Sequence, residues 1–445
     1  MDKKNSVFTK ISIYMIITIM IVLLCSIGLR IFTRMVLIEK LSMDNTFTRI
    51  VMFDNKSLST LPNQNSQKID WLSLYPFENK KENSVTDQEK SPISGIIETV
   101  KNLENSISVY SKDHLMFYTK FTEGAKAYNN LLKWTIEKYD EETILTYDDG
   151  HLVGTMWKAD VTPYVENISN FNAFLKEIDM PFLYAALPGK ISKYDKDISG
   201  VLDFSNQNFD SILNGIKNSG GEVFDLREKM AENFENHREQ FFFTDHHWKP
   251  ETGLWAAREI ATYLNQNFAY NFDLKKFDSE NFTKETYENI FLGTYGRTAT
   301  LSVANPEGID LFYPKYSVDM SIEIPARQLK DSGDFNVFYY YKMLEPGDFY
   351  NTAPYVSYIY GDDAITKLTN NDCNNDKSIL VIGDSMDNVV LPFLALGVKH
   401  ITAMDLRVFN GSLQTFIKQH KDEYDMVMIT NSVFTITAPK LYDFS

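Results

Sequence analysis

The chain has 445 residues, 44% of them apolar, which is enough for one large domain or two smaller ones with a substantial core. Its formal net charge is −16. Phosphate binding requires clustered Lys and Arg, so this charge argues against a nucleic-acid partner and, more weakly, against a strongly anionic polymer substrate. The only two cysteines, Cys25 and Cys373, are not expected to pair, which leaves no disulfide framework and no cysteine-based zinc site.

The first predicted element is an apolar segment near the N-terminus. Residues 11–29 carry no charge, and their 19 positions approach the roughly 20 residues that a helix needs to cross a bilayer core. No small-residue cleavage site follows, which favours an uncleaved signal anchor over a cleaved signal peptide. We therefore expect a cytoplasmic N-terminus at residues 1–10 and a transmembrane signal anchor at residues 11–33. The protein would then be a single-pass protein of a bacterial cell membrane with an extracytoplasmic body.

A spacer and a large body are predicted to follow. Residues 34–140 read as a juxtamembrane linker with one or two helices, because a polar, irregular stretch precedes apolar residues at helical spacing. Residues 141–445 form the body. An aromatic-rich insertion lies within it at about 269–370.

Within the body, short apolar runs alternate with helical patterns. In its first half we expect strands at 144–147, 152–154, 182–187 and 222–225, and helices at 171–178 and 209–217. After the insertion we expect strands at 378–382, 400–404 and 426–429, and helices from 388 onward and at 413–420. Such alternation predicts a mostly parallel sheet with crossover helices. The insertion's aromatic rings, as in 338–341, are better explained as the core of an antiparallel insertion than as a sugar-binding face.

Two adjacent histidines follow an apolar run in the segment Asp245-His246-His247-Trp248. Pro250 marks a helix start, so both histidines lie just before a helix N-terminus. The positive end of the helix dipole disfavours imidazolium, so we expect His247 to be neutral near pH 7, as a general base must be. Asp245, two residues earlier, can accept from the Nδ1–H of His247 and fix its tautomer. For a lone histidine, packing in the core would be the favoured explanation.

A candidate nucleophile stands at the end of a predicted buried strand. Ser385 follows the strand at 378–382 through Gly383 and Asp384, and the active site of an open parallel sheet lies at the carboxyl ends of its strands. Backbone N–H groups that open the next helix can stabilise an oxyanion. Asp245, His247 and Ser385 thus predict a hydroxyl nucleophile, its base and the group that orients the base.

A metal site is the alternative for the same histidines. Asp-His-His could ligate a divalent metal ion, as in phosphoesterases. Such sites need further carboxylates and histidines at other strand ends, and no compact second ligand motif is present. We therefore expect neither a metal nor a cofactor.

The motifs together resemble a known family. The segment 244–248 with its Pro-initiated helix looks like the bacterial DHHW protein family, and the segments 382–385, 390–394 and 404–407 echo the same pattern. That family is similar to the alginate O-acetyltransferase (AlgX/AlgJ-like) proteins, a branch of the SGNH hydrolase superfamily. The resemblance covers roughly residues 140–440, which would make 141–445 an SGNH-like catalytic domain.

The resemblance implies a fold and a set of site residues. The fold would be a flavodoxin-like three-layer α/β/α sandwich. The triad would be Ser385 as nucleophile, His247 as base and Asp245 as orienter, in the reversed order of the alginate acetyltransferase branch. Gly383, His246 and Arg407 are candidates for binding substrate or the oxyanion, and a structural ion pair is an equal alternative for Arg407.

The resemblance also implies a function and partners. We expect an extracytoplasmic, membrane-anchored O-acetyltransferase of a cell-surface or secreted polysaccharide, supplied with acetyl groups by a membrane-bound O-acyltransferase partner. The acidic charge favours a neutral glycan over alginate. Two alternatives stay open, a carbohydrate esterase (deacetylase) with the same triad and a non-catalytic glycan-binding or assembly protein.

Overall fold

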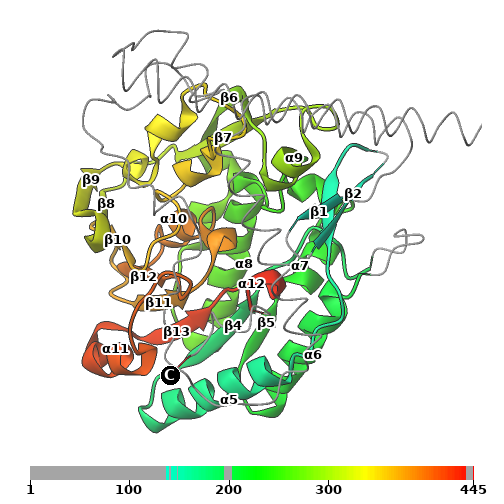
Figure 1. Cartoon of the computed structure of the whole chain (residues 1–445). Helices are drawn as coiled ribbons and strands as arrows, with labels where there is room; N and C mark the ends of the chain where they lie inside the picture. Colours follow the sequence, from blue (N-terminus) through cyan, green and yellow to red (C-terminus); the bar gives the residue numbers. More distant parts are fainter. Residues whose placement is uncertain (1–136, 140–141, 148, 195–202, 437–443, 445) are drawn as a thin grey trace, which may run out of the picture. The chain divides into compact units, whose positions relative to one another are not determined.

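The computed structural model describes residues 137–139, 142–147, 149–194, 203–436 and 444 (Figure 1). The predicted N-terminal segment, signal anchor and nearly all of the linker therefore lie outside the described residues. Among the residues that are described, no helix is long and apolar enough to cross a membrane.

An eight-stranded mixed sheet forms the centre of the body. In spatial order its strands are β5 (Val223–Asp225), β4 (Phe182–Ala186), β13 (Met426–Ile429), β11 (Ser378–Ile382), β12 (His400–Met404), β10 (Thr366–Asn370), β8 (Met320–Ile324) and β9 (Leu329–Gly333). Neighbours from β5 to β12 run parallel, and β10, β8 and β9 extend the sheet with antiparallel pairs. The expected mostly parallel sheet is thus corrected to a mixed one, because the insertion adds antiparallel strands at one edge.

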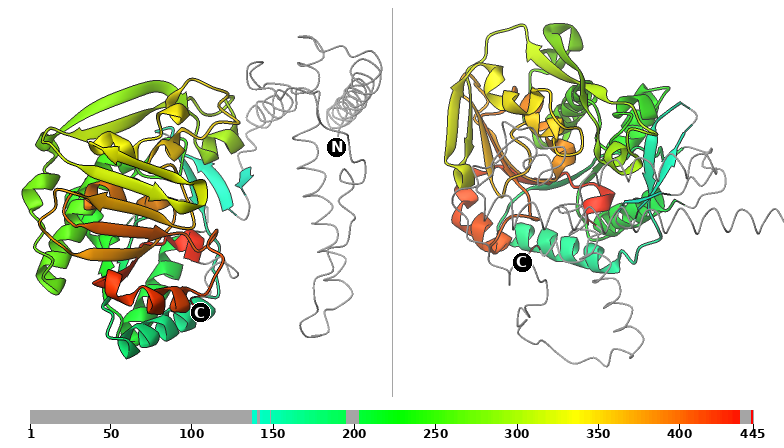
Figure 2. Two further views of the ribbon diagram at one scale, coloured as in Figure 1. Left: turned by 90° about the vertical axis from the view of Figure 1, so that its left-hand side faces the viewer. Right: turned by 45° about the horizontal axis from the view of Figure 1, so that its top comes forward.

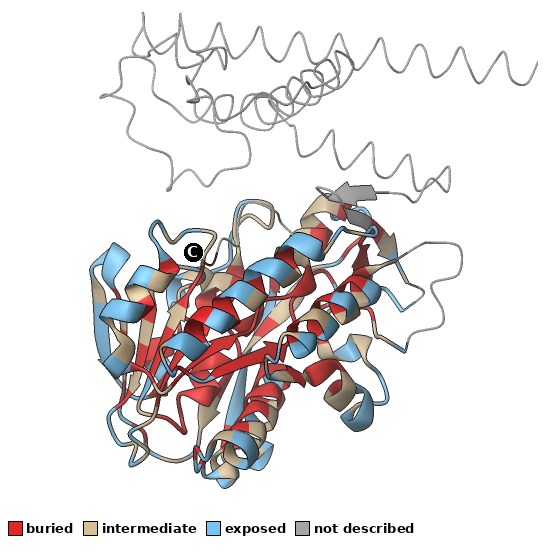
Figure 3. Ribbon diagram, turned by 90° about the horizontal axis from the view of Figure 1, so that it is seen from below, coloured by how far each residue is buried: buried red, intermediate tan, exposed pale blue. Residues whose placement is uncertain are grey.

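Helices cover both faces of this sheet (Figures 1 and 2). They are α5 (Thr162–Glu177), α6 (Ser205–Asn218), α7 (Leu226–Asn233), α8 (Pro250–Phe268), α10 (Leu391–Leu394), α11 (Leu413–Gln419) and α12 (Val433–Ile436). A further helix, α9 (Thr294–Ala299), instead packs in a separate small cluster with Ile144 and Leu152. Alternate residues of β4 show the two layers: Leu183 packs with α7, α8 and α10, and Tyr184 packs with α5, α6 and α11. Buried residues accordingly line the sheet and the inner helix faces (Figure 3). The predicted three-layer sandwich is confirmed.

Two smaller sheets complete the fold. One contains β1 (Glu137–Tyr139), β2 (Glu142–Thr146) and β3 (Leu152–Thr155), and the other is the antiparallel pair β6 (Phe282–Phe291) and β7 (Glu307–Pro314). The insertion's rings are mostly core, as predicted: Phe338 and Tyr339 are buried, while Tyr341 is 41% exposed.

Short 3₁₀ helices connect these elements. They are η5 (Arg238–Gln240), η6 (Leu274–Phe277), η7 (Ser279–Asn281), η8 (Pro325–Arg327), η9 (Phe335–Phe338), η10 (Tyr341–Leu344), η11 (Pro354–Ser357), η12 (Ser385–Asp387) and η13 (Lys421–Glu423).

Two predicted helices differ from the observed ones. The helix expected from 388 onward is only the single turn α10, which follows η12. Proline is tolerated only in the first turn of a helix, so Pro392 sets the start of α10, and Gly397 follows closely. The helix expected at 171–178 starts nine residues earlier, at Thr162. Pro163 lies in its first turn, and its N-terminal half buries few apolar side chains, so the periodic pattern there is weak.

Helix α8 approaches α10 closely at Gly253, where an added Cβ would overlap the carbonyl oxygen of Val389. We predict that Gly253→Ala lowers the free energy of unfolding by about 1–3 kcal/mol, although alanine favours a helix, because backbone cannot yield as a side chain can. Gly189→Ala is the control, since its added Cβ would meet only Phe434 at 3.7 Å. Urea unfolding of both variants measures the effect, and equal stability of the two would contradict it.

Candidate active site

The structure brings three predicted residues together from two distant segments. His247 precedes α8, and Ser385 begins η12 at the carboxyl end of β11. Nδ1 of His247 lies 3.0 Å from Oδ1 of Asp245, and Nε2 lies 2.8 Å from Oγ of Ser385. With the ring proton on Nδ1, the Ser385 hydroxyl donates to Nε2, which is the arrangement of a nucleophile, base and orienting carboxylate.

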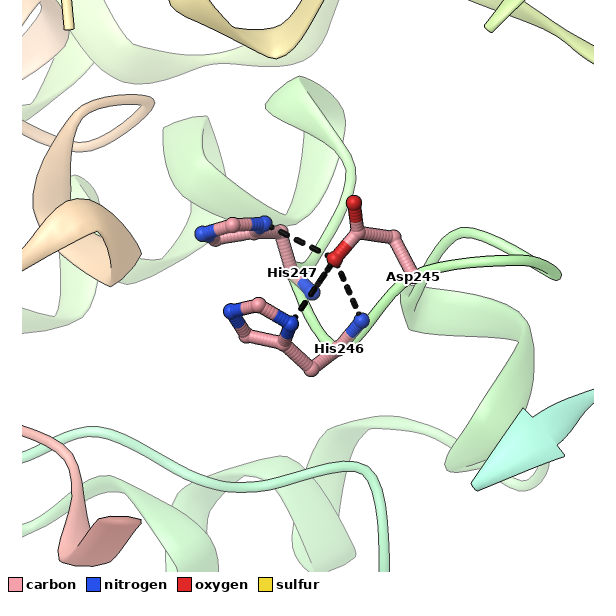
Figure 4. A group of neighbouring side chains, drawn as sticks. All are labelled: Asp245, His246 and His247. Carbon is pink, nitrogen blue, oxygen red and sulfur yellow. Dashed lines mark hydrogen bonds and ion pairs between the residues drawn. The ribbon is translucent and has the colours of Figure 1, made fainter. Parts of the chain in front are cut away.

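The carboxylate of Asp245 accepts more than one hydrogen bond (Figure 4). Its Oδ1 accepts from the backbone N–H of His246 at 2.6 Å and lies 2.9 Å from Nδ1 of that ring. Its Oδ2 accepts from the backbone N–H of Thr294 at 3.1 Å. Gly293 permits this approach, because an added Cβ there would overlap Asp245 itself. Together these donors compensate a buried charge and fix its direction.

The imidazole of His247 is held between two rings. Tyr355 stacks on it with centroids 3.8 Å apart and planes inclined by 17°, and His246 packs on it at 3.9 Å. The Tyr355 hydroxyl donates to the carbonyl oxygen of Ser385 at 2.9 Å. Tyr355 therefore contacts His247 with its ring and the backbone of Ser385 with its hydroxyl, which restricts how far the two residues can separate.

Trp248, the fourth residue of the segment Asp245–Trp248, has a structural role. It is fully buried, and its indole Nε1–H donates to the carbonyl oxygen of Met386 at 2.6 Å. Since Met386 follows Ser385 directly, this hydrogen bond ties the histidine segment to the serine turn.

The serine turn is also fixed from the other side. Oδ1 of Asp384 accepts from the N–H of Met386 at 3.0 Å, and Oδ2 accepts from the N–H and hydroxyl of Ser432 at 2.8 and 2.9 Å. Within the described chain, no acceptor is found for the backbone N–H of Ser385. That N–H is available to a substrate oxygen.

The remaining predicted site residues have structural partners. The N–H of Gly383 donates to the carbonyl oxygen of Met404, and an added Cβ there would overlap the Asp387 carboxyl, so this glycine serves close packing. Arg407 contacts Asp405 and Asp362, each at 2.6 Å, which matches the alternative of a structural ion pair. A substrate or oxyanion role for Gly383, Arg407 or His246 stays a prediction.

Asp245, His246 and His247 form the one group of ligand-type side chains in the described residues whose donor atoms converge closely enough for a metal ion. Their converging atoms already hydrogen-bond one another. A metal would have to replace these bonds, and no fourth His, Cys or carboxylate of the described chain joins the group. The residues present fit a proton relay better than a metal centre.

Two charged residues that the sequence did not single out hold the histidine segment. The buried Nζ of Lys190 donates to the carbonyl oxygens of Phe242, Phe243 and Asp245 at 2.5, 3.0 and 2.9 Å. Glu307 accepts from the backbone N–H groups of Phe243 and Thr244 at 2.8 and 2.7 Å. The Lys190 ammonium and the Glu307 carboxylate therefore pair with the carbonyl and N–H groups of the backbone that precedes His247.

The ionisation states of Asp245 and His247 agree with a proton relay. Burial first, and repulsion by His246 second, lower the pKa of His247 to about 4, although Asp245 opposes the shift. Burial acts to raise the pKa of Asp245, but the neighbouring histidines and their hydrogen bonds hold it well below its usual value. At pH 7 His247 is a neutral base beside an ionised carboxylate.

Replacing Lys190 should loosen the histidine segment. We predict that Lys190→Met lowers the free energy of unfolding by about 2–4 kcal/mol, because three buried carbonyls lose their donor and Glu307 loses its countercharge. Burial lowers the pKa of Lys190 to about 7, so urea unfolding is best measured at pH 6, where the amine is charged.

The matched control is Lys176→Met. Lys176 also donates to two backbone carbonyls, those of Ser219 and Gly220, but from an exposed position, so its loss should change stability by less than about 0.5 kcal/mol. Equal effects of the two substitutions would show that Lys190 has no special structural role.

Comparison with known proteins supports the same fold. Residues 147–318 match the family model described as the SGNH hydrolase-like domain of the acetyltransferase AlgX. This segment includes Asp245 and His247, and Ser385 lies beyond it. No curated protein matches the chain by sequence.

Solved structures extend the likeness beyond that segment. PatB1 of Bacillus cereus is 22% identical with a TM-score of 0.55, over 68% of this chain and 100% of that one. A second PatB1 structure, with a sulfonyl adduct, is 20% identical with a TM-score of 0.54, over 68% and 98%. A DHHW family protein from Eubacterium siraeum is 16% identical with a TM-score of 0.51, over 68% and 94%. The predicted resemblance is confirmed: the chain has an SGNH hydrolase-like α/β fold, and residues 147–318 are similar to the SGNH hydrolase-like domain of the acetyltransferase AlgX.

Proposed function

We propose that this protein is an extracytoplasmic O-acetyltransferase that acetylates a cell-surface or secreted polysaccharide through Ser385, His247 and Asp245. The observation that carries the proposal is the unbroken hydrogen-bonded line from Asp245 through His247 to the Ser385 hydroxyl, with contacts of 3.0 and 2.8 Å. The matching family model is described as a domain of an acetyltransferase, which supports acetyl as the transferred group.

The chemistry follows from the geometry. The Ser385 oxygen attacks the carbonyl carbon of an acetyl donor while its proton passes to Nε2 of His247. The backbone N–H of Ser385, which has no acceptor in the described chain, stabilises the oxyanion. The leaving group takes the proton from His247, and an acetyl-serine remains. A sugar hydroxyl then attacks the acetyl carbon and gives its proton to Nε2 of His247, which passes it to the Ser385 oxygen as the serine–acetyl bond breaks. The acetylated sugar leaves, and the free serine and the neutral histidine are restored.

The acceptor separates this proposal from its nearest rival. A deacetylase would use the same groups with water as the acceptor. The choice depends on which hydroxyl the pocket admits, and the triad geometry is the same for both.

The setting of the reaction belongs to the same proposal. The apolar segment at 11–33 would anchor the protein in a bacterial membrane with residues 141–445 outside. A membrane-bound O-acyltransferase would supply the acetyl groups. The net charge of −16 favours a neutral glycan as the acceptor.

Release of acetyl from a chromogenic acetyl ester tests the triad. We predict that Ser385→Ala and His247→Ala each lower kcat/KM at least ~10³-fold, because each removes a group that acts in every turnover. Phenylmethylsulfonyl fluoride should inactivate the wild-type protein by modifying Ser385, and chelator should have no effect. Ser211→Ala and His420→Ala, at surface positions outside the site, serve as controls.

Three results would overturn the triad. They are activity that survives Ser385→Ala, activity that chelator abolishes, and a folded wild-type protein without activity. If the triad holds, mass spectrometry of a glycan acceptor incubated with the ester separates acetyl transfer from hydrolysis.

The acidic limb of the pH profile should report His247. Its pKa lies near 4, below the ordinary 6.5, so the neutral base persists as the pH falls from 7 to about 5, and kcat/KM should decline only near pH 4. The unfolded histidine takes up its proton first, so stability should decrease as the pH falls from about 6.5 to about 4. A kcat/KM profile that falls with a midpoint near 6.5 would contradict this environment for His247.

A further inference from the structure

A solvent-open groove with an aromatic floor lies in the insertion. It is lined by β6, β7 and the segment around η9 and η10. Tyr341 presents a ring that is 41% exposed, and Tyr313 and Tyr316 contribute half-buried rings. Most other rings of the insertion are buried, and Tyr313 and Tyr316 pack partly against that core, so Tyr341 differs most from it.

Hydrogen bonds hold the polar groups of the groove in place. The Tyr313 hydroxyl donates to Glu285 at 2.9 Å and lies 3.2 Å from the Tyr341 hydroxyl. The Tyr341 hydroxyl donates to Oδ1 of Asn336 at 3.1 Å, and the Asn336 amide donates to Asp334 at 2.9 Å. The rings are therefore fixed before any ligand arrives, which reduces the entropy lost on binding.

We infer that this groove is an accessory binding site for an uncharged polysaccharide. The C–H face of a sugar ring packs on an exposed aromatic ring, and its hydroxyls pair with carboxylates and amides such as those of Glu285, Asp334 and Asn336. The two carboxylates repel a polyanion, and among the described residues Lys315 is the one basic side chain that lines the groove.

The groove is connected to the triad through aromatic contacts. Tyr313 packs on Tyr339 at 5.5 Å, Tyr339 on Tyr358 at 6.2 Å, Tyr358 on Tyr355 at 5.2 Å, and Tyr355 on His247 at 3.8 Å. This inference rests on the proposed function, in which the groove holds one part of a glycan chain. Other sugar units of the same chain are then kept at the surface of the protein, which raises their effective concentration for the triad.

The test uses the full-length protein with Ser385→Ala, so that binding is separated from turnover. Native affinity electrophoresis is run in gels that contain a mixed-linkage β-glucan, a galactomannan or dextran, with alginate as the polyanion. We expect at least one neutral polymer to retard the protein and alginate to have no effect. Adding Tyr341→Ala should weaken the retardation about tenfold, because the exposed platform is lost.

Two further variants control for folding and for ring chemistry. Tyr341→Phe keeps the ring and should bind within about threefold of the parent. Tyr263→Ala removes a half-buried tyrosine on α8 that also donates to a glutamate, Glu222, and it should leave retardation unchanged. Thermal unfolding confirms that each variant is folded.

The inference is overturned if no neutral polymer retards the protein, if Tyr341→Ala binds as the parent does, or if alginate binds as well as the neutral polymers. These outcomes leave acetyl ester cleavage by Ser385 untouched. Conversely, if Ser385 proves not to cleave acetyl esters, the electrophoretic result is unaffected. A failure of the proposed function is therefore distinguishable from a failure of the proposed glycan site.

Discussion

The buried carboxylate of Asp245 is the constraint on which the rest of the site depends. An ionised group with 2% exposure is stable only if its oxygens are fully paired, and backbone and ring N–H groups of His246, His247 and Thr294 supply the pairing. This need accounts for the doubled histidine, since both rings turn toward one oxygen. The charge so held selects the tautomer of His247 that can take a proton from a serine.

The aromatic-rich insertion supports the candidate active site and is not only an addition to the sheet edge. It provides Thr294 to Asp245, Glu307 to the histidine segment and Tyr355 to the imidazole and the serine turn. The SGNH-like sandwich supplies the strand ends, and the insertion closes around them. Variation in the insertion would therefore change both the site's rigidity and the surface offered to a glycan.

Short sequence patterns were sufficient to predict individual strands and the histidine segment, but not the contacts between distant segments. The strand at 378–382 and the segment Asp245–His247 were predictable because burial, periodicity and a helix start are visible in short windows. Lys190, Glu307 and Tyr355 were not, because their contacts join positions far apart in the chain. The lysine directly after Pro188-Gly189, at a strand end, was the one local signal available. The antiparallel edge escaped prediction because β8 and β10 belong to the insertion yet pair within the main sheet.

The role of Ser385 as the nucleophile is tested most directly by the mass of the protein during turnover. The protein would be mixed with an acetyl ester, quenched in acid and digested, and the peptides examined by mass spectrometry. We expect one added acetyl group on Ser385, which is absent from Ser385→Ala and formed far more slowly in His247→Ala. Steady acetyl release by the wild-type protein with the label on another residue, such as His246 or Lys190, would contradict it.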